Sequence, residues 1–171
     1  MKTKFPNLQL KHQIFILCSG IVFLLFIVSF YCFRITTVKI HKNAEIRVLE
    51  EINKYRQSRG LNILYSDERI TEAARDHSLK MAQGLVPLGH FHSYLRFEKI
   101  SQSGLEWVAA AENVACVPRL GDPAMEVFKI WTKERGYKKN MEGDFDLTGI
   151  GIAQNQTSGE YYLTQIFVKT K

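Results

Sequence analysis

The chain has 171 residues, of which 46% are hydrophobic and 23% charged, a composition typical of a folded protein and not of a disordered one. This length accommodates one domain with a sizeable core and an appendage. Residues 1–42 contain six Lys or Arg and no acid, which leaves 17 of the 23 basic residues against 17 acidic ones in 43–171. Because the body is neutral, the electrostatic argument for a nucleic-acid partner is removed.

The N-terminal part contains an apolar run from Ile14 to Phe33, 20 consecutive residues without a charge. As a helix, such a run spans roughly 30 Å, the thickness of the hydrocarbon layer of a bilayer. Its end is bulky and aromatic, unlike the small residues of a signal-peptide cleavage site, so the run predicts an uncleaved membrane anchor. The basic residues on its two sides are nearly balanced, with a slight preference for a cytoplasmic N-terminus.

Three cysteines are present, and two of them, Cys18 and Cys32, lie within this apolar run. Cys116 is alone in the body, so no disulfide can form within the domain and no cysteine cluster has the spacing of a zinc site. A small buried thiol is favoured over a reactive nucleophile at Cys116, since no neighbouring residue indicates a lowered pKa. We divide the chain into a basic tail (1–13), an anchor (14–33), a linker (34–43) and one domain (44–171).

Four helices are expected in the first two thirds of the domain. Apolar residues recur at helical spacing over about 44–59, with Gly60 suited to the end of that helix. Ser66 is a plausible N-cap of a second helix, whose apolar face includes His77 as a core histidine in preference to a ligand. A short third helix is predicted over 94–101, and the residues that follow Gly104 are expected to be extended to about Val117. Asp122 followed by Pro123 predicts the start of a fourth helix.

The last third changes to strand-like patterns over 147–154 and 160–169, separated by a hairpin turn at 155–159. Helices followed by strands predict an α+β fold with an antiparallel sheet. Between the helical regions, the segment 109–115 places a carboxylate, Glu112, and an amide, Asn113, among small apolar residues. A carboxylate in such surroundings is costly to bury unless it is paired or hydrogen-bonded, so Glu112 marks a candidate site.

Seven segments in order resemble the CAP superfamily, which joins cysteine-rich secretory proteins, antigen 5 and pathogenesis-related 1 proteins. The resemblance covers about residues 44–168 and is nearest to the bacterial branch, which lacks disulfides. The matching segments are Asn53-Lys54-Tyr55-Arg56, Gly60-Leu61, Ala73-Ala74-Arg75 with His77, His90 to Phe97, Ala111-Glu112-Asn113-Val114-Ala115, Trp131 to Asn140, and Gly149-Ile150-Gly151-Ile152 with Tyr161 to Phe167. It implies an α-β-α sandwich, with helices on both faces of a central antiparallel sheet.

The resemblance also implies a central cleft that holds a divalent metal between two His and two acidic residues in many members. His90 and Glu112 match the first histidine and the Glu-Asn glutamate, and Glu134 matches the second acid in members with Trp-x-x-Glu. The second histidine is missing, because Tyr137 and Tyr162 stand at the two places where members carry it. We therefore expect a cleft that includes His90, Glu112, Asn113, Glu134 and Tyr137, with His90 and Glu112 as the remaining candidates for a metal such as zinc.

Three functions remain open from the sequence. The first is a membrane-anchored module outside the cytoplasm that binds a ligand or partner at the cell envelope, with lipid as one candidate. The second is a metal-assisted or acid/base hydrolase that uses His90 and Glu112, for which Ser93 and Ser101 are nucleophile candidates only by proximity in sequence. The third is a structural module with a vestigial cleft, in which Glu112 and Asn113 satisfy backbone groups.

Overall fold

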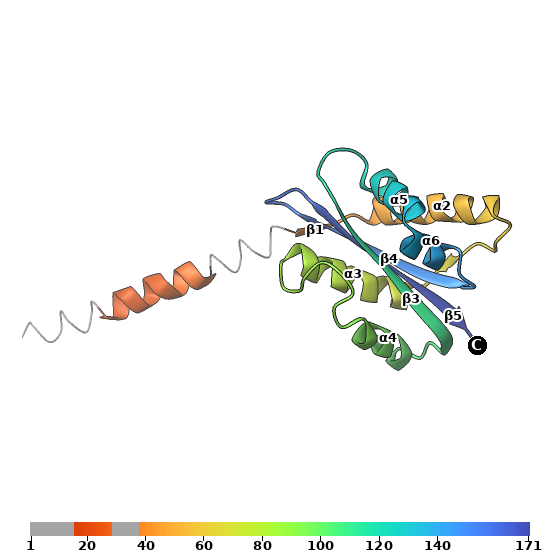
Figure 1. Cartoon of the computed structure of the whole chain (residues 1–171). Helices are drawn as coiled ribbons and strands as arrows, with labels where there is room; N and C mark the ends of the chain where they lie inside the picture. Colours follow the sequence, from red (N-terminus) through yellow and green to blue (C-terminus); the bar gives the residue numbers. More distant parts are fainter. Residues whose placement is uncertain (1–15, 29–37) are drawn as a thin grey trace, which may run out of the picture. The chain divides into compact units, whose positions relative to one another are not determined.

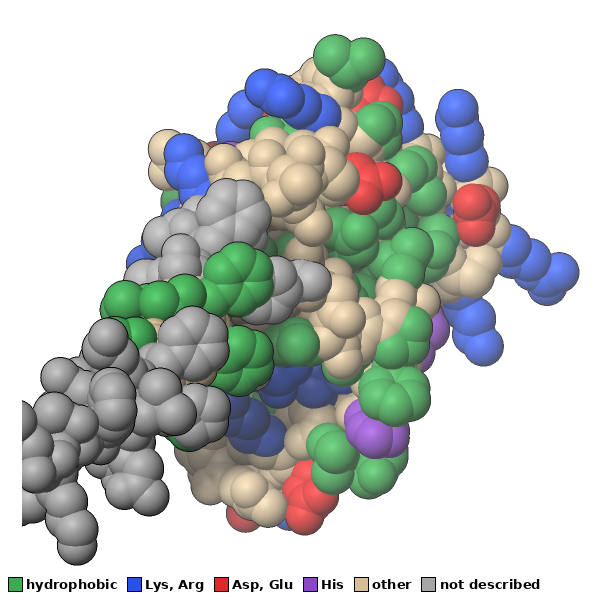
Figure 2. All heavy atoms as spheres, turned by 90° about the vertical axis from the view of Figure 1, so that its left-hand side faces the viewer, with side chains coloured by type: hydrophobic (Ala, Val, Ile, Leu, Met, Phe, Trp, Pro, Cys, Tyr) green, Lys and Arg blue, Asp and Glu red, His purple; other side chains and the backbone are tan. Residues whose placement is uncertain are grey.

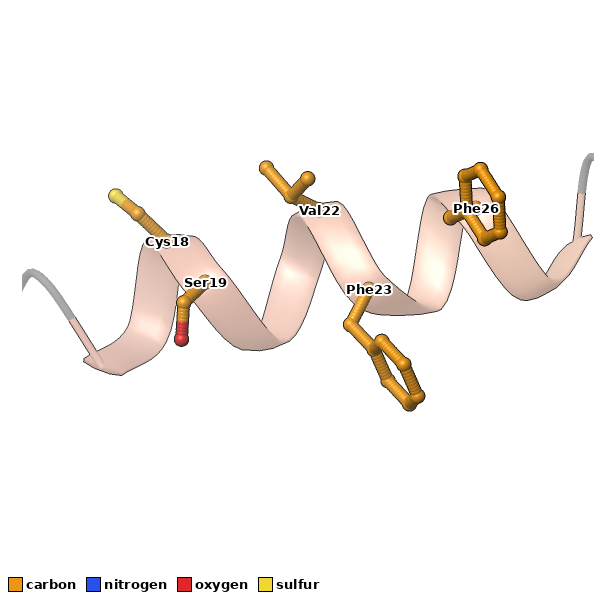
Figure 3. A pocket seen from close by; sticks show the side chains of 5 residues that line it. All are labelled: Cys18, Ser19, Val22, Phe23 and Phe26. Atoms are coloured by element: carbon orange, nitrogen blue, oxygen red, sulfur yellow. The ribbon is translucent and has the colours of Figure 1, made fainter.

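The structure is a computed structural model that describes residues 16–28 and 38–171. It comprises two units, Met1–Thr36 and Thr37–Lys171. In the first unit, residues 16–28 form a helix whose side chains are exposed all around, apart from a half-buried Ile27. Along it, Cys18, Val22 and Phe26 project to one side, and Phe23 to the other (Figure 3).

The described residues include no helix long and apolar enough to cross a membrane. The basic tail expected over 1–13 and both ends of the anchor expected over 14–33, namely 14–15 and 29–33, lie outside the described residues.

The second unit is built on an antiparallel sheet in the order β1-β4-β5-β3 (Figure 1). The strands are β1 (Val38–Ile40), β3 (Trp107–Val117), β4 (Leu147–Asn155) and β5 (Tyr161–Thr170), and a two-residue strand, β2 (Tyr65–Ser66), runs parallel to β4. β1 falls within the segment expected to be a linker, 34–43, and pairs with the end of β4. Three residues are too few for the alternation that identifies a strand in a sequence.

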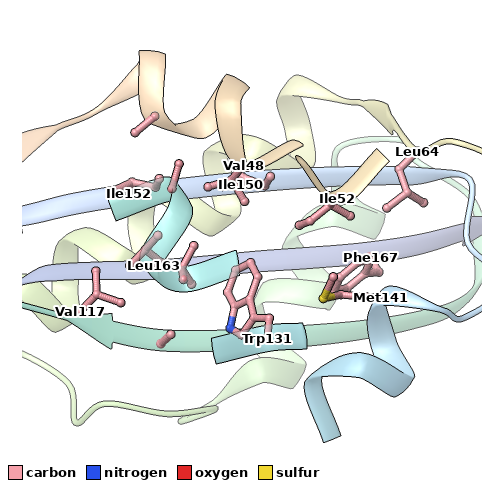
Figure 4. Close-up of a cluster of buried hydrophobic side chains, with 14 residues drawn as sticks. Val48, Ile52, Leu64, Val117, Trp131, Met141, Ile150, Ile152, Leu163 and Phe167 are labelled. Carbon is pink, nitrogen blue, oxygen red and sulfur yellow. The ribbon is translucent and has the colours of Figure 1, made fainter. Parts of the chain in front are cut away.

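One face of the sheet is covered by α2 (Lys42–Ser58), α5 (Pro123–Lys133) and α6 (Arg135–Met141). The larger core lies between these helices and the sheet, with Trp131, Ile52 and Phe167 fully buried at its centre (Figure 4). The fourth helix was expected to begin at Asp122-Pro123, and the Asp122 carboxylate does accept from the Ala124 backbone N–H. α6 was not expected, because seven residues with a glycine and two lysines show no apolar period.

The opposite face is covered by α3 (Glu68–Ala82), against which α4 (Ser93–Gln102) packs. A smaller core lies here, around Ile70, Ala74 and Ile166. α3 approaches β4 so closely that a Cβ on Gly151 would lie 2.3 Å from the Arg75 backbone nitrogen, and one on Gly149 2.2 Å from that of Thr71. The two glycines of the Gly-Ile-Gly-Ile motif are therefore required for helix–sheet packing.

The expected helices and strands are present, with small differences at their ends. The second helix is capped by Asp67, whose carboxylate accepts from the Arg69 backbone N–H, and not by Ser66, which is paired in β2. An α+β fold with helices on both faces of an antiparallel sheet, as the resemblance implied, is confirmed, apart from the parallel pairing of β2.

Two residues of the Asn-Lys-Tyr-Arg motif fasten α2 to the segments around it. Asn53 pairs with the backbone of Leu64 through both its amide N–H and its carbonyl oxygen. Arg56 is fully buried and donates to four backbone carbonyls, those of Asn62, Met141, Gly143 and Phe145. These contacts give the motif a structural role and satisfy a buried guanidinium without a carboxylate.

Candidate functional site

Glu112 lies in the middle of β3, the strand at one edge of the sheet. Successive side chains of a strand point to opposite faces, so Glu112 and Asn113 must diverge. The contacts agree with this rule. Glu112 binds Arg96 of α4 on one face, whereas Asn113 binds α6 on the other. The Glu-Asn dipeptide therefore serves both helical layers and does not present two groups to one cleft.

The Glu112 carboxylate is held by the guanidinium of Arg96 in a two-pronged pair. Arg96 Nε donates to Glu112 Oε2 at 2.7 Å, and Arg96 Nη2 donates to Oε1 at 2.7 Å. Only 2% of the Glu112 side chain and 9% of the Arg96 side chain are exposed. Such a bidentate, buried pair is the strong form of the ion pair and explains how a carboxylate is tolerated among alanines.

Arg96 is in turn positioned by two further partners. Its Nη1 donates to the Phe91 backbone carbonyl at 2.8 Å and lies 3.2 Å from Nδ1 of His77. His77 Nε2 is 2.8 Å from the Gly89 carbonyl, which can only accept, so Nε2 carries the proton and Nδ1 accepts from Arg96. Burial is the main cause that lowers the pKa of His77, and the Arg96 charge lowers it further. The expectation that His77 is a satisfied core histidine is confirmed.

His90 completes the network from the solvent side. Its Nδ1 lies 2.8 Å from Glu112 Oε1, while 54% of its side chain is exposed. His92, two residues on, takes the left-handed backbone conformation at φ 54°, and its ring stacks on Phe91 with 3.9 Å between centroids. Because of this turn, the two imidazoles are not presented to one ligand, and only His90 contacts Glu112.

The residues around Glu112 do not fit a zinc site. Both oxygens of Glu112 accept from Arg96, and one also pairs with His90, so a divalent ion would have to displace a buried guanidinium. Among the residues that the structure describes, no three His, Cys, Asp or Glu side chains are grouped so that they could hold a metal ion. Glu134 therefore does not join His90 and Glu112 as a third ligand. Arg96 already supplies the positive charge that a metal would bring to Glu112.

Asn113 is fully buried and has a structural environment. Its amide nitrogen donates to the Tyr137 backbone carbonyl at 3.2 Å, and its carbonyl oxygen accepts from Asn140 at 2.8 Å. Asn140 also donates to the Glu112 backbone carbonyl at 3.1 Å. This edge of the sheet is thereby joined to α6 by side-chain amides, a role that the sequence did not indicate for Asn140.

The two tyrosines at the places of the missing histidine lie in different surroundings. Tyr137 packs its ring near that of Trp131, and burial raises the pKa of its phenol. Tyr162 faces Cys116 in the β3–β5 register, four residues and therefore about 13 Å along the strand from Glu112. Burial raises the pKa of Tyr162 to about 12. Tyr162 therefore does not replace the absent imidazole beside Glu112.

A shallow cleft of about 310 Å³ opens between α3 and α4, with His77 and Arg96 among its lining residues. Apolar walls come from Val86, Phe91 and Leu95, while Lys99, His92 and the ion pair of Lys80 with Asp76 add charged or titratable groups. Buried Glu112 lies beyond Arg96, so the network supports this cleft from behind. None of the five residues expected to form a cleft, His90, Glu112, Asn113, Glu134 and Tyr137, is among its lining residues. Of the lining residues named here, only His77 was discussed from the sequence alone.

The most informative residue that the sequence interpretation passed over is Arg96. It lies within the matching segment His90 to Phe97 and was not named as a site residue, although it is the principal partner of Glu112. The sequence did contain a signal for this pair. Glu112 needs a partner if it is buried, and Arg96 lies in one of the other matching segments.

Comparison with known proteins agrees with this architecture. The model of the cysteine-rich secretory protein family, CAP, matches residues 49–167. An uncharacterised protein of Bacillus subtilis, YkwD, is 28% identical over 127 residues, which cover 73% of this chain and 47% of the relative. The chain thus spans about half the length of that curated relative.

Solved structures of three bacterial proteins share the fold. An outer surface protein of Borrelia burgdorferi superposes with a TM-score of 0.66 at 17% identity, over 78% of this chain and 98% of that one. An extracellular protein of Bacillus anthracis that contains an SCP domain gives 0.63 at 19% identity, over 75% and 41%. A cysteine-rich secretory protein of Staphylococcus aureus gives 0.59 at 18% identity, over 75% and 39%.

Proposed function

Because the chain belongs to the cysteine-rich secretory protein family, CAP, we propose that it is a membrane-anchored CAP domain that binds an anionic, lipid-like molecule of the cell envelope. The observation that carries this proposal is the lining of the α3–α4 cleft. Apolar walls together with Lys99, beside a Lys80 that is paired with Asp76, suit an amphiphile whose head is negatively charged. The volume of about 310 Å³ is at the lower end for small-molecule sites, so it fits part of a lipid and not a whole one.

The buried network gives the cleft a fixed shape. Arg96 contributes to its lining and is held by Glu112, His77 and the Phe91 carbonyl. A ligand that contacts this surface therefore meets a preorganised one, which reduces the entropy cost of binding.

The proposed position at the cell envelope is supported by the N-terminal sequence and by the relatives. A helix that is apolar all around is typical of a membrane span, and the described helix over 16–28 belongs to the longer apolar run, 14–33. Two of the similar solved structures are named as an outer surface and an extracellular protein. We therefore propose a single-pass anchor with the domain outside the cytoplasm.

The binding proposal is tested with the full chain in detergent and a fluorescent phosphatidylglycerol analogue. The double substitution Phe91→Asp with Leu95→Asp places charges on the apolar wall of the cleft and should weaken binding at least tenfold. Both side chains are exposed enough for the fold to survive, which circular dichroism checks. Val108→Asp, at an exposed apolar position on β3, is the matched control and should bind as the unchanged chain does. Equal binding by all three proteins would refute the proposal.

The anchor and its orientation need separate tests. Retention of the full chain in membranes after alkaline carbonate washing is the expected result for an integral anchor. Protease added to intact cells should digest the C-terminal domain if it faces outward. A domain protected in intact cells and digested only in opened ones would overturn the proposed location.

A hydrolase remains the second candidate, favoured by one observation. His90 is hydrogen-bonded to a buried carboxylate and more than half exposed, as an acid/base histidine would be. The nucleophile candidates are less suitable. Ser101 Oγ is engaged by the Trp107 indole N–H at 2.8 Å, and Ser93 is tied to His90 only through its backbone. Hydrolysis of envelope peptides or esters by the unchanged chain, lost in His90→Ala, would favour the enzyme over the binding module.

A further inference from the structure

Three segments that are distant in the sequence meet at the end of the domain where the chain enters it. β1 begins at Val38, which pairs with Asn155 at the tip of the β4–β5 hairpin. Asn155 donates to the Ala82 carbonyl at 2.9 Å, which ties the end of α3 to this hairpin. Across the hairpin, Gly159 lies against the Arg119 side chain, so closely that a Cβ on Gly159 would be 2.6 Å from Arg119 Cδ. Loops 83–89 and 118–121 therefore flank the start of β1, as Figure 1 also shows.

Each of these two loops exposes leucines to a degree that is unusual for a folded domain. Leu85 and Leu88 in the first loop are 69% and 55% exposed, and Leu120 in the second is 83% exposed. In the part of the chain that the structure describes, the cores include none of them. Figure 2 views the domain from this end and shows apolar side chains beside a histidine, with lysine and arginine side chains toward the rim.

Basic side chains lie close to these leucines. No Asp or Glu occurs from His77 to Phe97, although Lys80 in this stretch is paired with Asp76 of α3. Lys39 of β1 and Arg119 beside Leu120 are both exposed. Of the acids here, Asp122, two residues after Leu120, is paired with Arg47, and the Glu160 carboxylate at the hairpin accepts from Ser158 and Tyr162. Exposed leucines with basic neighbours are the combination that binds the headgroup region of an anionic bilayer.

We propose that this end of the domain docks on the bilayer, with Leu85, Leu88 and Leu120 inserted among the headgroups. The bilayer is identified as the partner because the proposed anchor lies close to β1 in the sequence. Only four residues, 34–37, separate the apolar run from β1, and they span at most about 14 Å when extended. An anchored domain therefore keeps the end at Val38 next to the membrane, where the leucines leave water. This inference rests on the anchor in the proposed function and is independent of ligand binding in the cleft.

The test uses the full chain in vesicles of phosphatidylcholine with about one third phosphatidylglycerol, the anionic lipid fraction that the electrostatic attraction requires. The three cysteines are replaced by serine, and a fluorophore is attached to Leu120→Cys or, as the matched control, to Val108→Cys. Val108 is also apolar and exposed, but lies beside Trp107 at the start of β3, the opposite end of that strand from the loop with Leu120. The label at 120 should be quenched by brominated lipid and shielded from iodide several-fold more than the label at 108.

Introducing Leu85→Asp and Leu88→Asp should abolish this difference while the chain remains with the vesicles, and the folded state is checked by circular dichroism. Flotation of the vesicles reports the anchor separately. If the chain floats and the two labels are quenched equally, docking is overturned and the anchor stands. If the chain does not float, the anchor and the docking that depends on it are both overturned.

Discussion

Removal of Arg96 is expected to be the most damaging single change in the region of Glu112. Arg96→Met keeps the length of the apolar stem but deletes both donors to a carboxylate that is 2% exposed. Breaking a buried ion pair by removing one partner costs about 3–5 kcal/mol, because the other charge is left uncompensated. Since small domains are stable by only about 5–15 kcal/mol, this variant should lose a large part of its stability.

The expected loss of unfolding free energy comes from leaving one charge of the Arg96–Glu112 pair buried without its partner. Replacing both partners, as in Arg96→Met with Glu112→Leu, removes the buried charge together with its counter-ion. The double variant should therefore be less destabilised than the sum of the two single variants by at least about 2 kcal/mol. His77 Nδ1 and the Phe91 carbonyl also lose a donor in this variant, so recovery will be incomplete.

The assay is urea unfolding of residues 37–171, followed by far-UV circular dichroism. This unit contains both cores and the whole sheet, and the chain covers 98% of the length of a solved protein of the same fold. The matched control is the exposed pair Lys80–Asp76, one turn apart on α3, for which a coupling of only about 0.3–0.5 kcal/mol is expected. A coupling for Arg96 and Glu112 as small as that of the control would refute the reasoning.

Three further outcomes are expected from the same unfolding assay and from thiol chemistry. Gly151→Ala should lower the free energy of unfolding by about 1–3 kcal/mol because the added Cβ would clash with the backbone of α3. Gly136→Ala, where the added Cβ meets open space, should be neutral or stabilising. Equal effects of the two substitutions would contradict the packing argument. Burial lowers the pKa of His77 in the folded domain, so below about pH 6.5 the unfolded state binds more protons than the folded one. The free energy of unfolding should therefore decline there by up to about 1.4 kcal/mol per pH unit. His77→Gln should flatten this slope, and exposed His92→Gln should not. Burial raises the pKa of the Cys116 thiol, so iodoacetamide at pH 7 should modify it much more slowly in the folded domain than in urea, and equal rates would argue for an activated cysteine.

The fold could be predicted from the sequence largely because its elements carry local signals. The helix that begins at Asp122-Pro123 and the hairpin at 155–159 are specified by residues next to one another in the chain. β1 and α6 were missed for the opposite reason. Val38–Ile40 is a strand only because the end of β4 lies beside it, and Arg135–Met141 is fixed by Asn113 and Asn140 across 27 residues of chain.

The candidate site was harder to predict, because it depends on side-chain direction. Glu112 and Asn113 are adjacent in the sequence and were assigned to one cleft with Glu134 and Tyr137. Adjacent residues of a strand point to opposite faces of the sheet. The extended conformation of this segment was expected, but the conclusion that Glu112 and Asn113 therefore point to opposite faces was not drawn. Likewise, His90 and His92 are only two residues apart in the sequence, but the left-handed backbone at His92 gives their side chains different surroundings.

The divergence of Glu112 and Asn113 also bears on how a ligand could be sensed. Glu112 holds α4 through Arg96, and its backbone carbonyl and its neighbour Asn113 hold α6 through Asn140. One short segment of the edge strand therefore connects the helices on both faces of the sheet. A ligand that shifted Arg96 in the α3–α4 cleft would act on the strand that positions α6, on the opposite face. This edge of the sheet is therefore a direct physical connection between the α3–α4 cleft and α6 on the opposite face.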